Sequence, residues 1–255
     1  MAITLQSAQL SLSGKTVLNN LSVSFASGCL TVILGPNGTG KSSLLKVLSG
    51  ELRCAGELSF YGKLRQHWSA PELAKSLAVL PQASSLNFNF TVREVVELGG
   101  MTLNASHDQI KKIAADNMAQ LAITSLAERL LPQLSGGEQQ RVHLARILTQ
   151  VAQSPRAPML LLDEPTSALD IAHQQQTLML LKELTQRGVG VIAVLHDLNL
   201  ATHYADRMII LHQGEIAADG KPAVVLSPEL IEGIYHYPVQ IISHPLHGYP
   251  LVVSG

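Results

Sequence analysis

Apolar and polar residues alternate along the first part of the chain. Leu21, Val23 and Phe25 are separated by serines, a period of two that predicts a half-buried strand. The stretch Cys29–Leu34 is then predominantly apolar up to Gly35, a pattern typical of a strand buried on both faces. The first 34 residues are therefore expected to be β-structure.

Further on, short apolar runs alternate with segments of helical period. Buried or half-buried strands are predicted for Gly56–Tyr61, Leu77–Leu80, Met159–Leu162 and Val189–Leu195. Helices are predicted for 42–48 before Gly50, from Pro71 to Lys75, and for Ile171–Arg187 before Gly188. This alternation of buried strands and helices predicts an α/β fold.

The strand runs vanish between residues 91 and 150, where the pattern is helical. Thr91 and Glu94 have the spacing of a capping box, which marks a helix start. Composition shifts near Ser84, and a polar, proline-rich connector precedes Met159. We therefore expect one domain over residues 1–255. Its α/β core and C-terminal tail are assigned to 1–84 and 157–255, and an inserted helical subdomain to 85–156.

Composition excludes several classes of protein. The 255 residues carry 18 basic and 19 acidic side chains, a balance that argues against a nucleic-acid binder. Cys29 and Cys54 are the only cysteines, so neither a disulfide framework nor a cysteine-based zinc site is expected. Residues 16–40 are uncharged, but polar residues and Pro36 interrupt them too often for a membrane span. With no signal peptide recognised, we expect a cytosolic chain, or one held at a membrane by another protein.

The strongest local motif lies between the apolar stretch 29–34 and the predicted helix. It fits G-x-x-x-x-G-K-[ST] and comprises Gly35, Pro36, Asn37, Gly38, Thr39, Gly40, Lys41 and Ser42, with Ser43 next. Its glycines allow successive amides to point at a phosphate chain, and the following helix adds the positive end of its dipole. Lys41 would reach the β- and γ-phosphates, and the Ser42 hydroxyl would bind Mg²⁺. The alternative is a glycine-rich turn without a ligand.

Two adjacent acids end the predicted strand Met159–Leu162. Asp163 would hold Mg²⁺ through its water shell. Glu164, on the other side of the strand end, could orient and polarise an attacking water. Polar residues also follow two other strands, Gln82 and His196, as expected where an open α/β sheet assembles a phosphate site. Taken singly, the acids could belong to a solvated loop, and Gln82 and His196 could be structural.

A second candidate anion site begins at Ser135. Ser135 and Glu138 have capping-box spacing, and Gly136 and Gly137 leave the first-turn amides of the predicted helix uncovered. An ordinary helix cap explains the same residues. Because this motif lies far from Lys41 along the chain and in another subdomain, a second copy of the chain could bring both motifs to one phosphate.

Together, these motifs resemble the nucleotide-binding subunits of ATP-binding cassette (ABC) transporters, in the family's order and over essentially the whole chain. The resemblance implies a P-loop NTPase (RecA-like) α/β core, with an N-terminal antiparallel β subdomain and an inserted helical signature subdomain. It also implies ATP and Mg²⁺ as cofactors. The implied partners are a second copy of the chain, two copies of a membrane permease and, indirectly, a periplasmic substrate-binding protein, with no nucleic acid. The location implied is peripheral, at the cytoplasmic face of the bacterial inner membrane.

The same resemblance implies roles for individual residues. Glu164 would be the general base, Gln82 would contact Mg²⁺ and the attacking water, and His196 would contact the γ-phosphate. Ser135 and Gly137 would bind the γ-phosphate of ATP held by the partner copy. Asp170, in Ser167–Asp170, would bridge the two copies.

Among such ATPases, the chain is most similar to those of iron-siderophore, cobalamin and haem importers, especially haemin importers. The similar stretches are Leu48–Leu52, Ser84–Val92 and His244–Pro250. None has a chemical reason to recognise haem. His244 and His247 are expected in a turn or short strand that packs on the core, rather than as haem ligands. Ferric-siderophore or cobalamin import remains an alternative, as does a soluble ABC ATPase such as an iron–sulfur assembly factor.

One position departs from the family pattern. An aromatic residue usually precedes the second strand and stacks on adenine, whereas counting from the strand pattern places Leu12 or Ser13 there. Since base stacking contributes about 1–3 kcal/mol in other contexts, we expect looser nucleotide selectivity or affinity.

Overall fold

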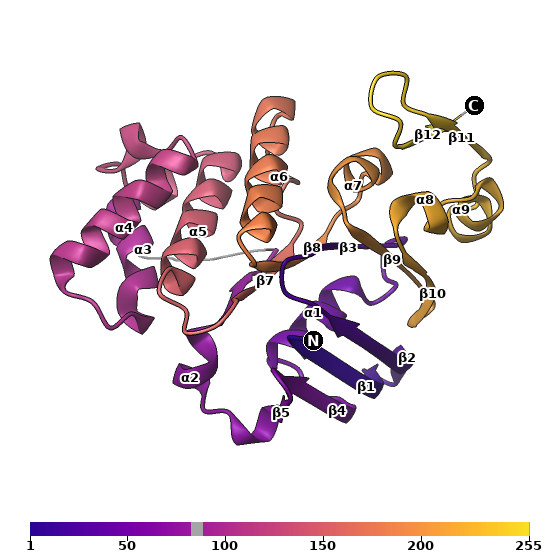
Figure 1. The fold of residues 1–255 in the computed structure, drawn as a ribbon, viewed down its shortest axis with the longest axis horizontal. Helices are drawn as coiled ribbons and strands as arrows, with labels where there is room; N and C mark the ends of the chain where they lie inside the picture. Colours follow the sequence, from indigo (N-terminus) through magenta and orange to yellow (C-terminus); the bar gives the residue numbers. More distant parts are fainter. Residues whose placement is uncertain (83–88, 255) are drawn as a thin grey trace.

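A six-stranded, mainly parallel sheet forms the centre of the molecule (Figure 1). The computed structural model describes residues 1–82 and 89–254. The strand order is β10-β9-β3-β8-β7-β6. The bounds are β3 Leu30–Leu34, β6 Leu77–Leu80, β7 Met159–Asp163, β8 Gly190–Val194, β9 Arg207–His212 and β10 Glu215–Gly220. Only β10 runs antiparallel to its neighbour in this sheet.

Neighbouring residues of the central strands point into two different hydrophobic cores. Val32 and Leu34 belong to one core, and Ile33 between them to the other. Every residue of β3, β7 and β8 is buried, which confirms the prediction that these apolar stretches form strands covered on both faces.

A four-stranded antiparallel sheet lies on one side of the central sheet, with strand order β2-β1-β4-β5. Its strands are β1 Ile3–Leu12, β2 Lys15–Phe25, β4 Ala55–Phe60 and β5 Lys63–Leu64. The register of β1 against β2 shifts between Leu5 and Ala8, where Ser7 adopts φ 48°. Helix α1, Lys41–Ser49, contributes Leu44, Leu45 and Leu48 to the core that this sheet shares with the central one.

The opposite side of the central sheet is covered by helices (Figure 1). They include α6 Ile171–Gln186, α7 Leu198–Tyr204 and α5 Gly136–Val151. Two further helices of the helical region, α3 Val92–Leu98 and α4 His107–Gln120, pack against α5. The capping boxes expected at Thr91 and Ser135 are present, and a third one at Ser106 starts α4. The expected boundary at 84/85 lies outside the described residues, so the assigned subdomain limits stay predictions.

Helix α5 is tied to the central sheet at its C-terminal end. The Gln150 side chain donates to the carbonyls of Ala74, at 2.8 Å, and Leu77, at 3.0 Å. Ala74 ends the short helix α2, Ala70–Ala74, and Leu77 begins β6. The helical region therefore has a polar attachment to the edge strand in addition to its apolar packing.

The C-terminal segment packs against α7. It contains α8 Pro222–Val225, α9 Pro228–Tyr235 and a hairpin of β11, Val239–Ser243, and β12, Pro250–Ser254. Asn199 of α7 exchanges two hydrogen bonds with the Val252 backbone, at 3.0 and 2.8 Å. Among the described residues, no helix is both long and apolar enough to cross a membrane.

The turn that begins at Gly99, directly after α3, approaches α5 closely, and this predicts a specific sensitivity to substitution. A Cβ on Gly99 would overlap the backbone carbonyl of Arg146, whereas a Cβ on Gly233 in α9 would meet nothing within 4 Å. We expect Gly99→Ala to lower the free energy of unfolding by about 1–3 kcal/mol through overpacking. Gly233→Ala should be neutral or stabilise by up to about 1 kcal/mol. Urea denaturation of both variants checks this, and equal stabilities would contradict the packing argument.

Candidate functional site

The residues that directly follow four parallel strands of the central sheet lie together at one edge of that sheet. After β3 comes the loop 35–40, after β6 Gln82, after β7 Glu164, and after β8 His196. These segments surround a hollow of about 710 Å³. Its lining comprises Val17, Asn37, Gly38, Gly40, Lys41, Ser42, Ser43, Gln82, Glu164 and His196. The structure thus gathers most of the residues that the sequence nominated.

The loop after β3 has a backbone that requires glycine. Gly35, Gly38 and Gly40 adopt φ 144°, 79° and 99°. A Cβ on Gly35 would also overlap the carbonyl of Leu211, and a Cβ on Gly40 would lie 2.8 Å from the carbonyl of Val17. Residues with a side chain therefore do not fit at these positions, and glycine allows the loop to turn tightly before α1.

The Lys41 ammonium lies inside this loop. It donates to the carbonyls of Gly35, at 2.7 Å, and Pro36, at 2.9 Å, and the Thr39 hydroxyl also donates to Pro36, at 2.9 Å. Burial lowers the pKa of Lys41, while the charges of Glu164 and Asp163 act in the opposite direction. A cation fixed at a helix N-terminus in this way is suited to bind an anion.

The Ser42 hydroxyl and the Asp163 carboxylate lie next to each other. The Ser42 hydroxyl donates to the Asp163 carboxylate at 3.2 Å, and Asp163 is 6% exposed. Burial raises the pKa of this carboxyl, and the bond from Ser42 partly opposes that shift. Hydroxyl and carboxylate oxygens are the donors that Mg²⁺ prefers, so these residues fit the predicted metal. Gln82 points instead to Glu164, where its amide donates at 3.0 Å.

Two of the polar side chains at the strand ends contact the Glu164 carboxylate. Its Oε1 accepts the bond from Gln82 and lies 2.6 Å from Nε2 of His196. Glu164 has φ 53°, a left-handed conformation that costs a non-glycine residue about 1–3 kcal/mol. Such strain at a carboxylate beside an anion-binding loop is typical of a functional position.

Gln140 is a residue of the site that the sequence reasoning did not nominate. From α5 its amide donates to the backbone carbonyl of Glu164 at 2.6 Å and accepts from the Ala168 amide at 3.4 Å. Gln140 therefore holds the strained turn after β7. The sequence does show two successive glutamines, Gln139 and Gln140, in the first turns of a capped helix. It does not show which residues their side chains contact.

Ser135, Gly136 and Gly137 are not part of the hollow's lining. Ser135 caps α5, with its hydroxyl accepting from the Glu138 amide at 3.3 Å. Ser135 and Gly136 are exposed, and a Cβ on Gly137 would lie 2.7 Å from the Ala168 carbonyl. Asp170 similarly caps α6, accepting from the His173 amide at 2.9 Å.

The wall beside the phosphate loop includes residues of the hairpin between β1 and β2. A second hollow, of about 390 Å³, adjoins the loop, and neither Leu12 nor Ser13 lines it or the first hollow. The hairpin residues that do are Lys15, Thr16 and Val17. The aromatic side chain in this lining is Tyr235 of α9, whose pKa is raised by burial. The expectation that Leu12 or Ser13 stands in the place of the adenine-stacking aromatic, with looser nucleotide selectivity or affinity, stays a prediction.

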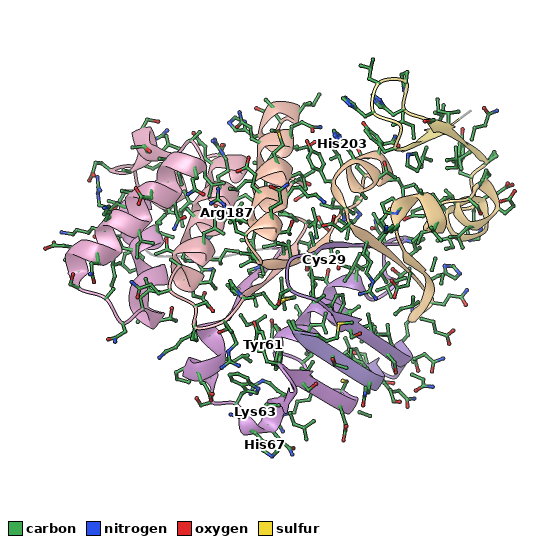
Figure 2. The ribbon with its side chains drawn as sticks, in the orientation of Figure 1. Cys29, Tyr61, Lys63, His67, Arg187 and His203 are labelled. Atoms are coloured by element: carbon green, nitrogen blue, oxygen red, sulfur yellow. The ribbon has the colours of Figure 1, made fainter. Side chains whose placement is uncertain are left out.

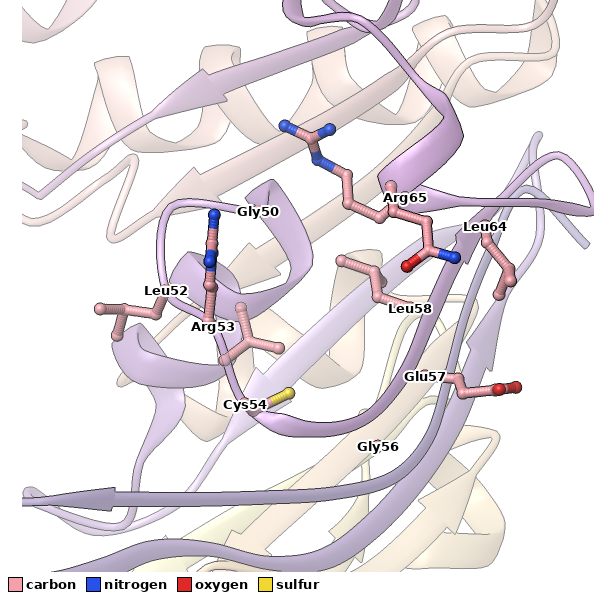
Figure 3. Close-up of a pocket in the computed structure, with 11 residues that line it drawn as sticks. Gly50, Leu52, Arg53, Cys54, Gly56, Glu57, Leu58, Leu64 and Arg65 are labelled. Carbon is pink, nitrogen blue, oxygen red and sulfur yellow. The ribbon is translucent and has the colours of Figure 1, made fainter.

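A further hollow, of about 640 Å³, lies beyond the C-terminal end of α1 (Figure 3). Arg53, Cys54 and Arg65 contribute to its lining, and it contains none of the nominated site residues. Burial raises the pKa of the Cys54 thiol, which keeps it protonated at neutral pH. This hollow is therefore separate from the site at the strand ends.

Comparison with known proteins agrees with the geometry. The sequence profile described as ABC transporter matches residues 18–167. The chain belongs to the ABC transporter family. A cassette of this family from Photobacterium profundum, named Hemin import ATP-binding protein HmuV, is 53% identical over 254 residues, covering 100% of this chain and 92% of its own. A protein of the same name from Shewanella denitrificans is 49% identical over 98% of this chain and 100% of its own.

Solved structures of the family have the same fold. A chain from an inward-facing ABC transporter superposes with TM-score 0.82 at 26% identity, covering 100% of this chain and 97% of the other. The ADP conformation of the cassette MJ1267 gives TM-score 0.77 at 24% identity, over 92% and 98%. The predicted P-loop NTPase core, with its antiparallel β subdomain and inserted helices, is confirmed.

Burial of Asp163 predicts an effect on stability. Because its pKa is raised, the folded state binds this proton more tightly than the unfolded chain, and stability is lost as pH rises through that pKa. Asp163→Asn keeps the oxygen facing Ser42 and removes the buried charge. We expect it to raise the Tm of the nucleotide-free, metal-free protein at pH 7.5 by about 2–4 °C.

Thermal unfolding followed by circular dichroism checks this, and the gain should shrink when the measurement is repeated near pH 4.5. Asp116→Asn, an exposed position on α4, is the matched control and should leave the Tm unchanged. A lower Tm for Asp163→Asn at pH 7.5 would refute the sign of the argument.

Proposed function

We propose that this protein is the ATP-hydrolysing subunit of a bacterial ABC importer that powers haem uptake. The observation that carries the enzymatic part is the Glu164 carboxylate, held by Gln82 and His196 beside the glycine loop. The relatives named for hemin import, which align over the whole chain, support the substrate.

ATP binds with its phosphates in the loop Gly35–Ser43. The backbone amides and the α1 N-terminus face the phosphate oxygens, and Lys41 supplies a positive charge to the β- and γ-phosphates. Ser42 and Asp163 would hold Mg²⁺, with Gln82 joining them as the third polar side chain. When bound, the metal neutralises charge that develops on the phosphate oxygens.

Glu164 is the general base in this proposal. Its carboxylate orients a water toward the γ-phosphorus and accepts a proton from it. Gln82 and His196 both face that carboxylate, so each would share its bond with the attacking water or the γ-phosphate. Gln140 acts as a positioning residue because it holds the Glu164 backbone and touches no reacting atom.

The active unit is a homodimer. Ser135, Gly136 and Gly137 are outside the hollow of their own chain, and two of them are exposed. The capped N-terminus of α5 would therefore bind the γ-phosphate of ATP held by the partner copy. Asp170, at the start of α6 and exposed, would contact the same partner. When two ATP molecules are bound, the contacts between each γ-phosphate and the α5 N-terminus of the other copy stabilise the closed dimer.

The complete importer would contain two permease copies, with a periplasmic binding protein delivering the ligand. The ATPase subunits would then sit at the cytoplasmic face of the inner membrane. Of the stretches that carry the haemin-importer resemblance, Leu48–Leu52 ends α1 and His244–Pro250 forms the C-terminal hairpin loop. The third, Ser84–Val92, lies mostly outside the described residues. Ferric siderophore and cobalamin are the competing substrates.

The dimer can be tested with two substitutions in one background. Glu164→Gln should keep ATP binding, lower turnover by about 10²-fold or more, and trap an ATP-bound dimer. Adding Ser135→Phe should abolish that dimer, because the ring would occupy the α5 N-terminus. Analytical ultracentrifugation with ATP and Mg²⁺ measures both.

Loss of the cap alone needs its own control. Ser106→Ala removes the equivalent cap from α4, at a cost of about 1 kcal/mol, and should leave the Glu164→Gln dimer intact. An undiminished dimer after Ser135→Phe would overturn the shared site.

The substrate is tested in the assembled importer. The subunit and its co-purified permease, reconstituted in lipid vesicles, should hydrolyse ATP faster when haem-loaded binding protein is added to the outer side. Cobalamin-loaded and siderophore-loaded binding proteins serve as matched controls. If one of these control proteins stimulates hydrolysis and haem-loaded protein does not, that ligand and not haem is the substrate. If no permease co-purifies with the subunit, the protein is better explained as a soluble ATPase.

A further inference from the structure

The phosphate loop is bordered by two hollows, and the proposed hydrolysis uses the one at the strand ends. The second hollow, of about 390 Å³, lies between the β1–β2 hairpin, the turn that joins β9 to β10 and the end of α9. Val17, Asn37 and Gly38 line both hollows, so the two meet at the phosphate loop. The hairpin and α9 side of the second hollow has no role in the proposed hydrolysis.

The strand order gives the direction in which a bound nucleotide extends. In the proposed function, the γ-phosphate lies beside Glu164 and His196, which follow β7 and β8. The central sheet is ordered β10-β9-β3-β8-β7-β6, so the loop after β3 separates these two residues from the β9–β10 turn. A phosphate chain that runs from Glu164 across the loop therefore leads to the second hollow. Figures 1 and 2 show α9 on this side of the sheet, beside β9 and β10.

The lining of the second hollow combines an aromatic ring with apolar and polar groups. Tyr235, the last residue of α9, is half-buried, and a hydrogen bond from the Gly35 amide to its hydroxyl holds the ring at the phosphate loop. Val17 and Ile234 add apolar surface. A nucleoside fits such a lining, because its base has an apolar face and its edges and ribose carry hydrogen-bonding groups.

One polar atom of this lining lacks a partner. Nδ1 of His212, at the end of β9, is buried, and no described residue hydrogen-bonds to it. A buried nitrogen in this state costs free energy, since it has lost its bond to water and gained no other. The edge of a base or a ribose hydroxyl placed in the hollow would supply that bond.

We infer that the nucleoside half of ATP lies in this second hollow, with its base against the ring of Tyr235. The inference rests on the proposed function, which places the phosphates in the loop Gly35–Ser43. It gives the C-terminal helix α9, rather than the β1–β2 hairpin, the aromatic contact with the base. A segment about 190 residues beyond the phosphate loop thereby takes part in binding the nucleotide.

Nucleotide titration of the full-length Glu164→Gln protein, which should bind ATP without rapid hydrolysis, tests the site. Isothermal titration calorimetry compares ATP with inorganic tripolyphosphate, which has a phosphate chain and no nucleoside. Adding Tyr235→Ala should weaken ATP binding by about tenfold or more, as expected for the loss of stacking on a base, and leave tripolyphosphate binding unchanged. Tyr235→Phe keeps the ring and should bind ATP within about threefold of the parent protein.

The matched control is Tyr237→Ala, because this exposed tyrosine of the same segment lines neither hollow. It should bind both ligands as the parent does. Equal weakening of ATP and tripolyphosphate by Tyr235→Ala would overturn the inference, since Tyr235 would then only support the phosphate loop. Unchanged ATP binding by the folded Tyr235→Ala protein would overturn it as well.

A second variant leaves Tyr235 in place and fills the hollow from the hairpin. Thr16→Trp changes an exposed residue of the lining, so we expect the fold to survive and the ring to exclude the nucleoside. ATP binding should weaken by about tenfold or more while tripolyphosphate binding is unchanged. Gln9→Trp, at an exposed position of β1 outside both linings, is the control for a bulky ring on the same sheet. If Tyr235→Ala does not fold, Thr16→Trp decides, and full ATP binding by it refutes the site.

The same titrations keep this inference distinct from the proposed function. If the parent protein binds ATP and the Tyr235→Ala and Thr16→Trp variants bind it equally well, the nucleoside lies elsewhere and the proposed function stands. If the parent protein binds neither ATP nor tripolyphosphate and the wild type hydrolyses no ATP, the proposed function itself fails.

Discussion

The site depends on parallel pairing of four central strands. Pairing of β3 with β8, β8 with β7 and β7 with β6 brings their carboxyl ends to one edge. Residues far apart along the chain, such as Lys41, Gln82 and His196, therefore meet without a local sequence signal to join them. Since successive side chains of a strand face opposite ways, a one-residue slip of β7 would exchange Asp163 and Glu164.

The turn after β7 combines strain with support. Glu164 adopts a left-handed conformation, and its carbonyl accepts bonds from Gln140, at 2.6 Å, and from the Ser167 hydroxyl, at 3.1 Å. These bonds come from α5 and from the loop before α6. The orientation of Glu164 is thus determined by the helical region as well as by the sheet, which would link the proposed catalysis to the position of α5.

Features encoded locally could be predicted from the sequence. The buried strands, the glycine loop and the caps at Thr91 and Ser135 each depend on residues within a few positions of one another. Features created by tertiary packing could not. Gln140 reaches Glu164 through the crossing of α5 and β7, and Tyr235 enters the loop-side hollow from a distant helix.

The anchorage of α5 sets how the helical region can turn. Gln150 fixes one end of this helix to the base of β6, whereas its other end carries the exposed Ser135. Sixteen residues span about 24 Å, so a rotation of about 10° about the anchored end would move the tip by about 4 Å. A small tilt of the helix at its attachment to the edge strand would therefore displace Ser135 by more than the length of a hydrogen bond.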